Sequence, residues 1–568
     1  MTEGILISDL FRNTWRWLTN RLRLLSRRRL DYVVLRITGS YPERTLLPQR
    51  RFPMTLLPWP QPPPSVDAFA CALEHLALDP RVKGVVLLIS DLSAGPATLS
   101  SLRQVIARFR SSGKRTVAYL QDLSIWPYYL AVACDEILVP ESTDFHAAGL
   151  WSEVLFFKNT LSMIGVQADF EAIAEYKVSP DILRRTKMTE PHREMLESML
   201  DSLYNEVTAA TSDGRSMAPK RVRKLFDSVP LPAEEARDAG LLDGVCYEDE
   251  LPARLGTGEV PATLVPWEQV RRRLVRPRRW YSRRAIGVIS LEGTIVPGSS
   301  RRAPFPLPIP LPIPTSQVGS DTLIQQLRAA AANRRLAAVI LHVDSPGGSA
   351  LASDLIWREL THLRHIKPLV VSMGNIAASG GYYVSAPANA IFAQATTLTG
   401  SIGIWGGKIV TSGLYDRIRA KREVVFRGKA AGLYADIALF SDEERAKVCA
   451  ELGRGYTRFK ARVAEGRNMA DDQVEAVARG RVWTGEQAMA HGLVDALGDL
   501  RTAAERAREM AGISPRRYAP LVDVQVPKYY QVPQPFPTNA LQWLDGLLAL
   551  LREGVFALAP WSIRIGGK

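Results

Sequence analysis

The sequence predicts an α/β protein made of two tandem repeats, each with a parallel β-sheet and flanking helices. Segment 31–39 recurs as segment 285–293, and segment 128–130 (Tyr-Tyr-Leu) recurs as 382–384 (Tyr-Tyr-Val), both at an offset of 254 positions (285 − 31 and 382 − 128). Short β-rich apolar runs alternate with helical stretches in each repeat, which is the pattern of parallel α/β units. A chain of 568 residues has room for two such domains.

The predicted elements follow the same order in both repeats. Each repeat should begin with a strand and continue through a proline-rich loop, a helical stretch, a buried strand, a helix and a further strand. The strands are expected at 33–38, 85–89 and 116–120 and again at 287–291, 339–343 and 369–373, with helices at 102–110 and 352–364. In parallel sheets, functional groups gather at the carboxyl ends of the strands, so a site is expected in the segments that follow them.

The repeat and the local composition divide the chain into five parts. An arginine-rich stretch with a proline separates the repeats, as expected of an exposed linker. Beyond the second repeat, leucines at helical spacing within 541–551 are interrupted by charged residues, which predicts an amphipathic helix. The expected parts are an amphipathic N-terminal segment (1–30), the first repeat (31–270), a basic linker (271–284), the second repeat (285–510) and a C-terminal tail with that helix (511–568).

The net charge of +14 indicates an anionic partner or surface. Basic residues are spread along the chain without a nucleic-acid-binding motif, so we expect no nucleic-acid partner. An anionic membrane surface is favoured, because apolar side chains recur at helical spacing near the N-terminus with arginines on other faces. These apolar residues are Phe11, Trp15, Leu18, Leu22 and Leu25. The alternative is a helix that packs on its own domain or on another subunit.

Membrane association is expected to be peripheral. No apolar run reaches the length of a membrane-spanning helix, and the N-terminus lacks the pattern of a signal peptide. The side of the membrane is left open. Two proline-rich apolar segments, 52–60 and 303–314, occupy matching places in the repeats and predict stiff extended loops. Contact with a membrane, with another subunit or with an apolar substrate is open for both.

Metal and cofactor sites are not indicated by the sequence. The four cysteines are scattered and form no C-x-x-C pair, which argues against a zinc site and a disulfide scaffold. His362 and His365 lie three positions apart on a predicted helix, but no third ligand stands nearby. We therefore expect neither a metal nor a cofactor.

The two repeats differ where chemistry is expected. Only the second has the pair Gly347-Gly348 and the serine Ser379, each after a predicted buried strand. Acyl transfer needs a nucleophile, a base and donors for the oxyanion. Small neighbours let Ser379 sit in a tight turn, and Gly380 with Gly347 or Gly348 would supply backbone N–H donors. The alternative is a plain tight turn, since the sequence has neither a G-x-S-x-G elbow nor a His–Asp pair that suggests a triad.

Four motifs stand in the order found in one protease family. They are 345–349 (Ser-Pro-Gly-Gly-Ser), 377–383 (Ala-Ala-Ser-Gly-Gly-Tyr-Tyr), 399–404 (Thr-Gly-Ser-Ile-Gly-Ile) and 482–485 (Val-Trp-Thr-Gly). Over about residues 30–510 the chain resembles the long, tandem-repeat form of signal peptide peptidase A. The resemblance implies a fold like those of ClpP and crotonase, a Ser–Lys dyad that cleaves leftover signal peptides in or beside the membrane, and a homotetramer.

The resemblance also implies roles for individual residues. Ser379 matches the nucleophile of the family, and Gly380 with the pair Gly347-Gly348 matches its oxyanion region. Ser401 matches a serine that orients the lysine. Its counterpart in the first repeat is Ala147, so this serine is also absent from that repeat.

Two lysines are candidates for the general base. In the long form of the family the base comes from the first repeat, from a segment like 174–180, which points to Lys177. A lysine acts as a base only when burial lowers its pKa toward the working pH. Lys429 aligns with Lys177 at an offset of 252 (429 − 177), where single-repeat members carry their lysine. Lys429 is open as a second base, a relic or a substrate-binding charge, and we favour Lys177.

The function predicted from these features is that of a membrane-associated serine endopeptidase acting on apolar peptides such as cleaved signal peptides. An extended substrate is expected to add to a strand edge, with segment 403–406 as a wall of its side-chain pocket. The alternatives are a catalytically silent membrane scaffold of the same fold and a crotonase-like acyl-CoA enzyme.

Overall fold

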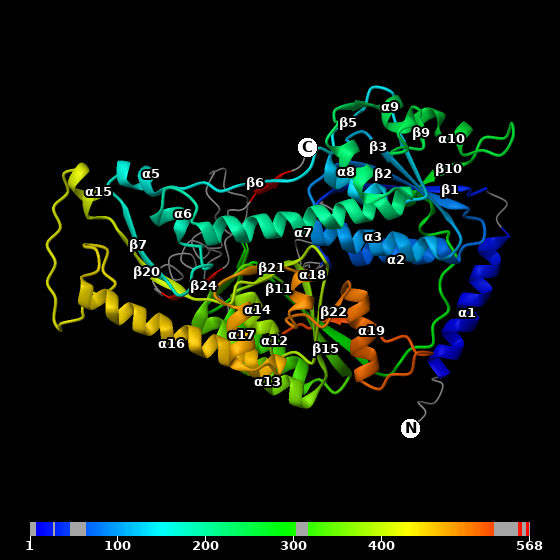
Figure 1. The fold of residues 1–568 in the computed structure, drawn as a ribbon. Helices are drawn as coiled ribbons and strands as arrows, with labels where there is room; N and C mark the ends of the chain where they lie inside the picture. The colour runs from blue at the N-terminus through cyan, green and yellow to red at the C-terminus, as the bar shows by residue number, and fades with distance from the viewer. Residues whose placement is uncertain are drawn as a thin grey trace.

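A computed structural model of the chain describes residues 7–25, 29–45, 64–302, 316–526, 555–558 and 564–566. Each repeat forms a sheet of mainly parallel strands with helices on both faces, and a third sheet joins the two (Figure 1). The predicted proline-rich loops 52–60 and 303–314 and the predicted helix within 541–551 lie outside the described residues.

The first repeat is built on a six-stranded parallel sheet. From one edge to the other, its strands are β10 (Leu264–Pro266), β1 (Tyr32–Gly39), β2 (Gly84–Leu92), β3 (Arg115–Leu120), β4 (Glu136–Val139) and β9 (Gly244–Val245). Successive residues of β2 are fully buried, as expected for a parallel sheet covered on both faces. The three strands predicted for this repeat are confirmed as β1, β2 and β3.

Helices α2 (Val66–Leu78) and α3 (Pro96–Arg110) pack on one face of this sheet. Helix α3 begins six residues before the predicted helix 102–110. Pro96 occupies the first helical position, where its fixed backbone angle and missing N–H suit a helix, and Gly95 is the N-cap. The predicted helix 102–110 lacks these first six residues.

The second repeat is built on an eight-stranded sheet. Its main path runs β21 (Val482–Thr484), β19 (Leu398–Gly400), β17 (Leu369–Ala378), β15 (Leu336–Ser345), β11 (Ala285–Glu292) and β23 (Leu521–Asp523). Off this path, β18 (Ala390–Ala393) pairs with β17, and β22 (Ala496–Leu497) pairs with β18. Helices α12 (Ser320–Ala332) and α13 (Ala350–Ile366) cover one face, and α19 (Leu500–Met510) covers the other. The three predicted strands are confirmed as β11, β15 and β17.

The third sheet takes strands from both repeats and positions the site. Its order is β13 (Arg301–Arg302), β14 (Ser316–Gly319), β12 (Thr294–Val296), β16 (Gly347–Ser349), β24 (Val555–Leu558), β20 (Trp405–Val410) and β7 (Gln167–Ala172). Only β7 belongs to the first repeat, and it pairs antiparallel with β20 along its whole length. This pairing brings the segment that follows β7 against the second repeat.

Two long helices frame the contact between the repeats. Helix α7 (Glu190–Arg215) crosses between the two parallel sheets, and α16 (Asp442–Arg467) runs along the lower side of the molecule in the view of Figure 1. The contact has an apolar part, in which Met195 of the first repeat packs with Val482 of the second, and a polar part. Ser100 and Thr396 share a hydrogen bond of 3.0 Å, Ser202 and Thr484 share one of 2.7 Å, and Gln104 donates to Gln394 at 3.0 Å.

Helix α1 (Ile7–Leu24) lies at the edge of the molecule beside the linker 271–284 (Figure 1). It holds the linker through two side-chain amides. Asn13 donates to the carbonyl of Arg279 and accepts from its N–H, both at 3.1 Å, and Asn20 does the same with Arg276 at 2.9 and 3.0 Å. The linker backbone is therefore fixed at these two points, although half of its side chains are exposed.

The remaining described elements are short. They are α4 (Ile125–Ala131), β5 (Asp144–Phe145), β6 (Trp151–Glu153), α5 (Lys158–Met163), α6 (Asp181–Arg184), α8 (Pro219–Phe226), β8 (Leu231–Pro232), α9 (Ala233–Asp238), η2 (Glu248–Glu250), α10 (Leu251–Arg254), α11 (Trp267–Val270), α14 (Gly380–Ser385), α15 (Ser412–Arg417), α17 (Asp471–Val477), α18 (Gly485–Ala490) and β25 (Arg564–Gly566). Within the described ranges, every helix is too short or too polar to cross a membrane.

Candidate active site

Ser379 lies at the junction between β17 and α14, at the carboxyl end of the strand. Its backbone has φ 55° and ψ −114°, a conformation that residues other than glycine rarely adopt. Its N–H donates to the carbonyl of Gly400 at 2.8 Å, which holds the turn in place. A Cβ on Gly381 would lie 2.7 Å from the carbonyl oxygen of Ser345, so this tight approach requires glycine. The strained turn presents a fully buried serine at the end of the sheet.

Lys177 reaches Ser379 from the other repeat. It lies five residues beyond the end of the paired strand β7 (177 − 172) and extends into the second repeat. Its Nζ is 2.7 Å from Ser379 Oγ, 3.0 Å from Ser401 Oγ and 3.1 Å from the carbonyl oxygen of Ser401. The structure thus brings together the three polar side chains that the sequence singled out.

Burial lowers the pKa of the Lys177 amine well below its ordinary value of 10.5. The side chain is 1% exposed, and removal from water penalises the charged ammonium form. The groups around Nζ are hydroxyl and carbonyl oxygens, and none of the three is a carboxylate. A neutral amine at this position has a free lone pair, which is what a general base for Ser379 needs.

Ser401 completes the contact to the lysine. It also has a positive φ of 51°, and its N–H donates to the carbonyl of Arg481 at 2.7 Å. This geometry directs both its hydroxyl and its carbonyl oxygen at Lys177 Nζ. Two acceptors fixed in this way hold the amine beside Ser379.

The three predicted oxyanion glycines occupy different environments. Gly380 is the first residue of α14, where a helix N–H has no partner within the helix. The N–H of Gly347 donates to Ser345 Oγ at 3.1 Å, so this donor is already used within the chain. Gly348 packs against β12, and a Cβ there would lie 2.0 Å from the carbonyl oxygen of Ile295. Gly380 is therefore the predicted donor that the geometry leaves most open.

Lys429 lies away from this cluster. It is exposed, in the segment between α15 and α16 that extends to the left end of the molecule in Figure 1. Helix α14, which begins directly after Ser379, lies near the centre of that view. The amine that the structure places beside Ser379 is that of Lys177.

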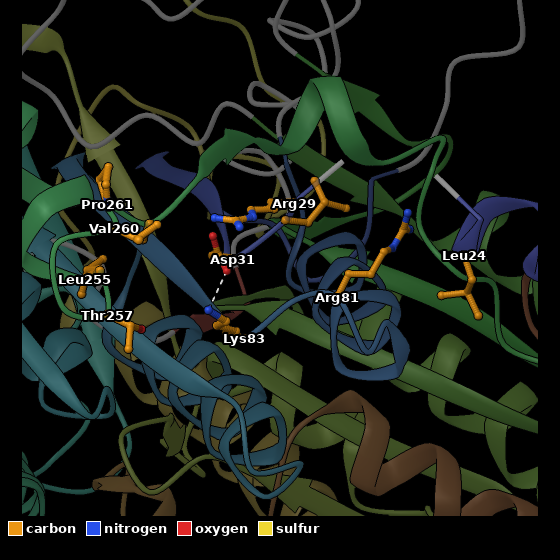
Figure 2. Close-up of a pocket in the computed structure, with 12 residues that line it drawn as sticks. Leu24, Arg29, Asp31, Arg81, Lys83, Leu255, Thr257, Val260 and Pro261 are labelled. Carbon is orange, nitrogen blue, oxygen red and sulfur yellow. Dashed lines mark ion pairs between the residues drawn. The ribbon is translucent and has the colours of Figure 1, made fainter. Parts of the chain in front are cut away.

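A cavity of about 540 Å³ lies elsewhere, at the amino ends of the first parallel sheet. Figure 2 shows Asp31, which precedes β1, and Lys83, which precedes β2, pointing toward one another across it; their ion pair measures 2.7 Å. Asp31 also accepts from the N–H of Thr263 at 3.0 Å. These contacts fasten neighbouring strands, and the cavity lies at the end of the sheet opposite to the one where α/β proteins place their sites.

The described residues contain no group of three or more His, Cys, Asp or Glu side chains arranged to hold a metal ion. The chemistry around Ser379 is that of a hydroxyl and an amine. A family model described as peptidase family S49 matches residues 108–259 and 361–514, one match in each repeat. The chain belongs to peptidase family S49.

Three relatives align with more than three quarters of this S49 chain. The chain is 34% identical over 456 residues to "Serine protease SPPA, chloroplastic" of Arabidopsis thaliana. This alignment covers 79% of the chain and 66% of that protein. It is 30% identical to "Protease 4" of Haemophilus influenzae, covering 77% of this chain and 72% of that protein. "Protease 4" of Salmonella typhi is also 30% identical, with 78% and 71% covered.

A solved structure of a ClpP1 mutant from Listeria monocytogenes matches 38% of this chain and 93% of its own, with 14% sequence identity and a TM-score of 0.24. A TM-score at this level adds nothing to the fold assignment. That assignment rests on the two S49 matches and on the sheets described above.

Gly480 is a site residue of this S49 chain that sequence reasoning missed. It has φ 81°, and a Cβ there would lie 2.5 Å from the backbone nitrogen of Lys177. Its N–H donates to the carbonyl of Ile402 at 2.8 Å, next to Ser401. Gly480 therefore supports the loop that carries the amine. It stands between two arginines in the sequence, without a motif that would have drawn attention to it.

Proposed function

We propose that the chain is a serine endopeptidase in which Lys177 is the general base for Ser379. The observation that carries the proposal is the 2.7 Å contact between a buried amine and a buried hydroxyl on a strained strand-to-helix turn. Family membership supports the same reaction class. Cleaved signal peptides are the proposed substrates, following the printed name "Putative signal peptide peptidase SppA" of a relative from Enterococcus faecium.

The proposed reaction proceeds through an acyl-enzyme. Lys177 takes the proton from Ser379 Oγ as this oxygen attacks the carbonyl carbon of the scissile bond. The N–H of Gly380, together with Gly348, donates to the oxyanion, and Ser401 keeps the amine in position. Lys177 then gives its proton to the leaving amine as the C–N bond breaks. A water molecule, deprotonated by Lys177, hydrolyses the ester and restores Ser379.

A fluorophosphonate probe tests this proposal. We expect covalent labelling at Ser379, with a rate that rises about tenfold per pH unit below the lowered pKa of Lys177 and then levels off, because only the neutral amine acts as a base. Mass spectrometry of the labelled peptide gives the site, and Ser379→Ala is the control that removes it. A silent scaffold or an acyl-CoA enzyme would leave Ser379 unlabelled at every pH.

Peripheral association with an anionic membrane is the second part of the proposal. Helix α1 turns its polar side to the protein: Asp9 and Asn13 are 1% and 2% exposed and contact the linker. Its apolar side faces outward, with Phe11 75%, Trp15 59% and Leu22 61% exposed. An outward apolar stripe flanked by arginines suits insertion at a lipid surface. The homotetramer implied by the family resemblance stays a prediction.

Leu22→Glu tests the membrane surface. Because burying a leucine contributes roughly 1.5–3 kcal/mol, we expect its loss to lower binding to anionic lipid vesicles at least about tenfold. Co-sedimentation with phosphatidylglycerol vesicles measures the effect. Leu439→Glu is the matched control, since Leu439 is 49% exposed but lies far from α1 in the chain. Equal binding by Leu22→Glu and Leu439→Glu would reject α1 as the contact.

A further inference from the structure

The C-terminal part of the chain contributes a strand to the third sheet, next to the candidate active site. Strand β24 lies between β16 and β20 and runs antiparallel to both. In register, Leu558 faces Gly347, Ala557 faces Gly348, and Phe556 lies between Ser349 on one side and Trp405 on the other. Strands β16 and β20 are joined in this sheet through β24, so without it two strand edges would face each other across an open channel.

That channel is where a peptide substrate would need to lie. Strand β16 begins two residues after Ser345, which pairs with Ala377, two residues before Ser379. Because β24 is antiparallel to β16, its carboxyl end at Leu558 points back toward this junction. A peptide in the same place would carry the carbonyl after its last paired residue toward Ser379. Extended peptides bind to open strand edges through their backbone groups in just this geometry.

We propose that segment 555–558 is an intramolecular ligand of the substrate channel and competes there with peptide substrates. The proposal rests on the proposed peptidase function. The segment reads Val-Phe-Ala-Leu, which is the apolar, extended type of peptide expected as substrate. Further along the chain, β25 pairs antiparallel with β6 of the first repeat, so the tail is anchored again beyond the channel. A segment anchored at two places in the protein is expected to leave the channel slowly.

The channel is expected to bind peptides mainly through the backbone groups of β16 and β20. Two of the three β16 residues that face β24 are glycines, and β20 contributes Gly406 opposite Val555. Glycines leave room for side chains of different size while their backbone groups still pair. The proposed ligand class is therefore an apolar peptide of varied sequence, bound in extended form.

Ala557→Pro tests the proposal in the full-length protein. Proline lacks the N–H that a strand paired on both sides must donate, so the substitution should release β24 from the channel. The readout is hydrolysis of the peptide Gly-Val-Phe-Ala-Leu carrying aminomethylcoumarin at its carboxyl end. If the tail fills the channel in nine tenths of the molecules, KM should fall about tenfold with kcat unchanged. Ala540→Pro, in the same tail but outside β24, is the matched control and should keep the wild-type KM.

Hydrogen exchange detects whether segment 555–558 occupies the channel without depending on catalysis. In the Ser379→Ala protein, the β16 amides that point toward β24 should be protected from hydrogen exchange, and adding Ala557→Pro should remove that protection. Unchanged protection together with an unchanged KM would overturn the intramolecular ligand. Absence of hydrolysis and of fluorophosphonate labelling in every variant would instead reject the peptidase function, and the exchange result would still decide the place of the tail.

Discussion

Replacing Lys177 by alanine is expected to abolish peptide hydrolysis, whereas replacing Lys429 by alanine is expected to leave it unchanged. Lys177 Nζ is 2.7 Å from Ser379 Oγ inside the protein, and Lys429 is exposed on a distant segment. Loss of a general base lowers the rate by about 10²- to 10⁴-fold. The measurement is kcat/KM for the fluorogenic peptide at a pH above the lowered pKa of Lys177. Full activity of Lys177→Ala with loss of activity in Lys429→Ala would reverse the assignment.

Lys177→Met separates the chemistry of the amine from its volume. Methionine fills a similar space without a base, so it should be as inactive as Lys177→Ala while unfolding at a temperature no lower than that of the wild type. Burying Lys177 destabilises the folded wild-type protein, because its amine must lose a proton, and Lys177→Met lacks this cost. Between the lowered pKa of folded Lys177 and 10.5, the unfolded chain binds a proton that the folded chain does not. Stability of the wild type should therefore rise with pH across that window, and Lys177→Met should remove this rise.

Local sequence patterns singled out Ser379 but not Lys177. Ser379 was placed at a sheet end because a β-branched run precedes it and glycines follow it, and the structure has it at the end of β17. Lys177 has no such signal, because a lone lysine is ordinarily a solvated charge. Its burial depends on pairing between β7 and β20, which are more than 230 positions apart in the chain. Only the family resemblance pointed to it.

The amphipathic N-terminal helix was predicted, but its orientation was not. Periodicity separates an apolar side from a polar side without saying which side meets the protein. In α1 the polar side meets the protein, because the side-chain amides of Asn13 and Asn20 each donate to and accept from the linker backbone. Local sequence patterns did not predict strand β24 either. Its partners β20 and β16 lie 151 (556 − 405) and 209 (557 − 348) positions earlier in the chain.

Gly480→Ala is expected to lower kcat/KM by at least about a hundredfold, although residue 480 does not touch Ser379. Displacing a catalytic group by about 1 Å lowers the rate by about this factor. The added Cβ would lie 2.5 Å from the nitrogen and 2.7 Å from the Cα of Lys177. These are backbone atoms, so no side-chain rotation relieves the clash. The loop must move, and the amine moves away from Ser379 with it.

Gly492→Ala is the control that isolates this effect. Gly492 has φ 73°, close to the 81° of Gly480, but a Cβ there would have no neighbour within 4 Å. Both variants bear the cost of a left-handed alanine, about 1 kcal/mol, which urea unfolding should detect in each. Only Gly480→Ala should lose activity, and its fluorophosphonate labelling should need a higher pH, because a displaced Lys177 is better solvated and its pKa rises. If both variants keep the same kcat/KM, the position of the Lys177 loop does not depend on Gly480, and the support proposed for that loop is wrong.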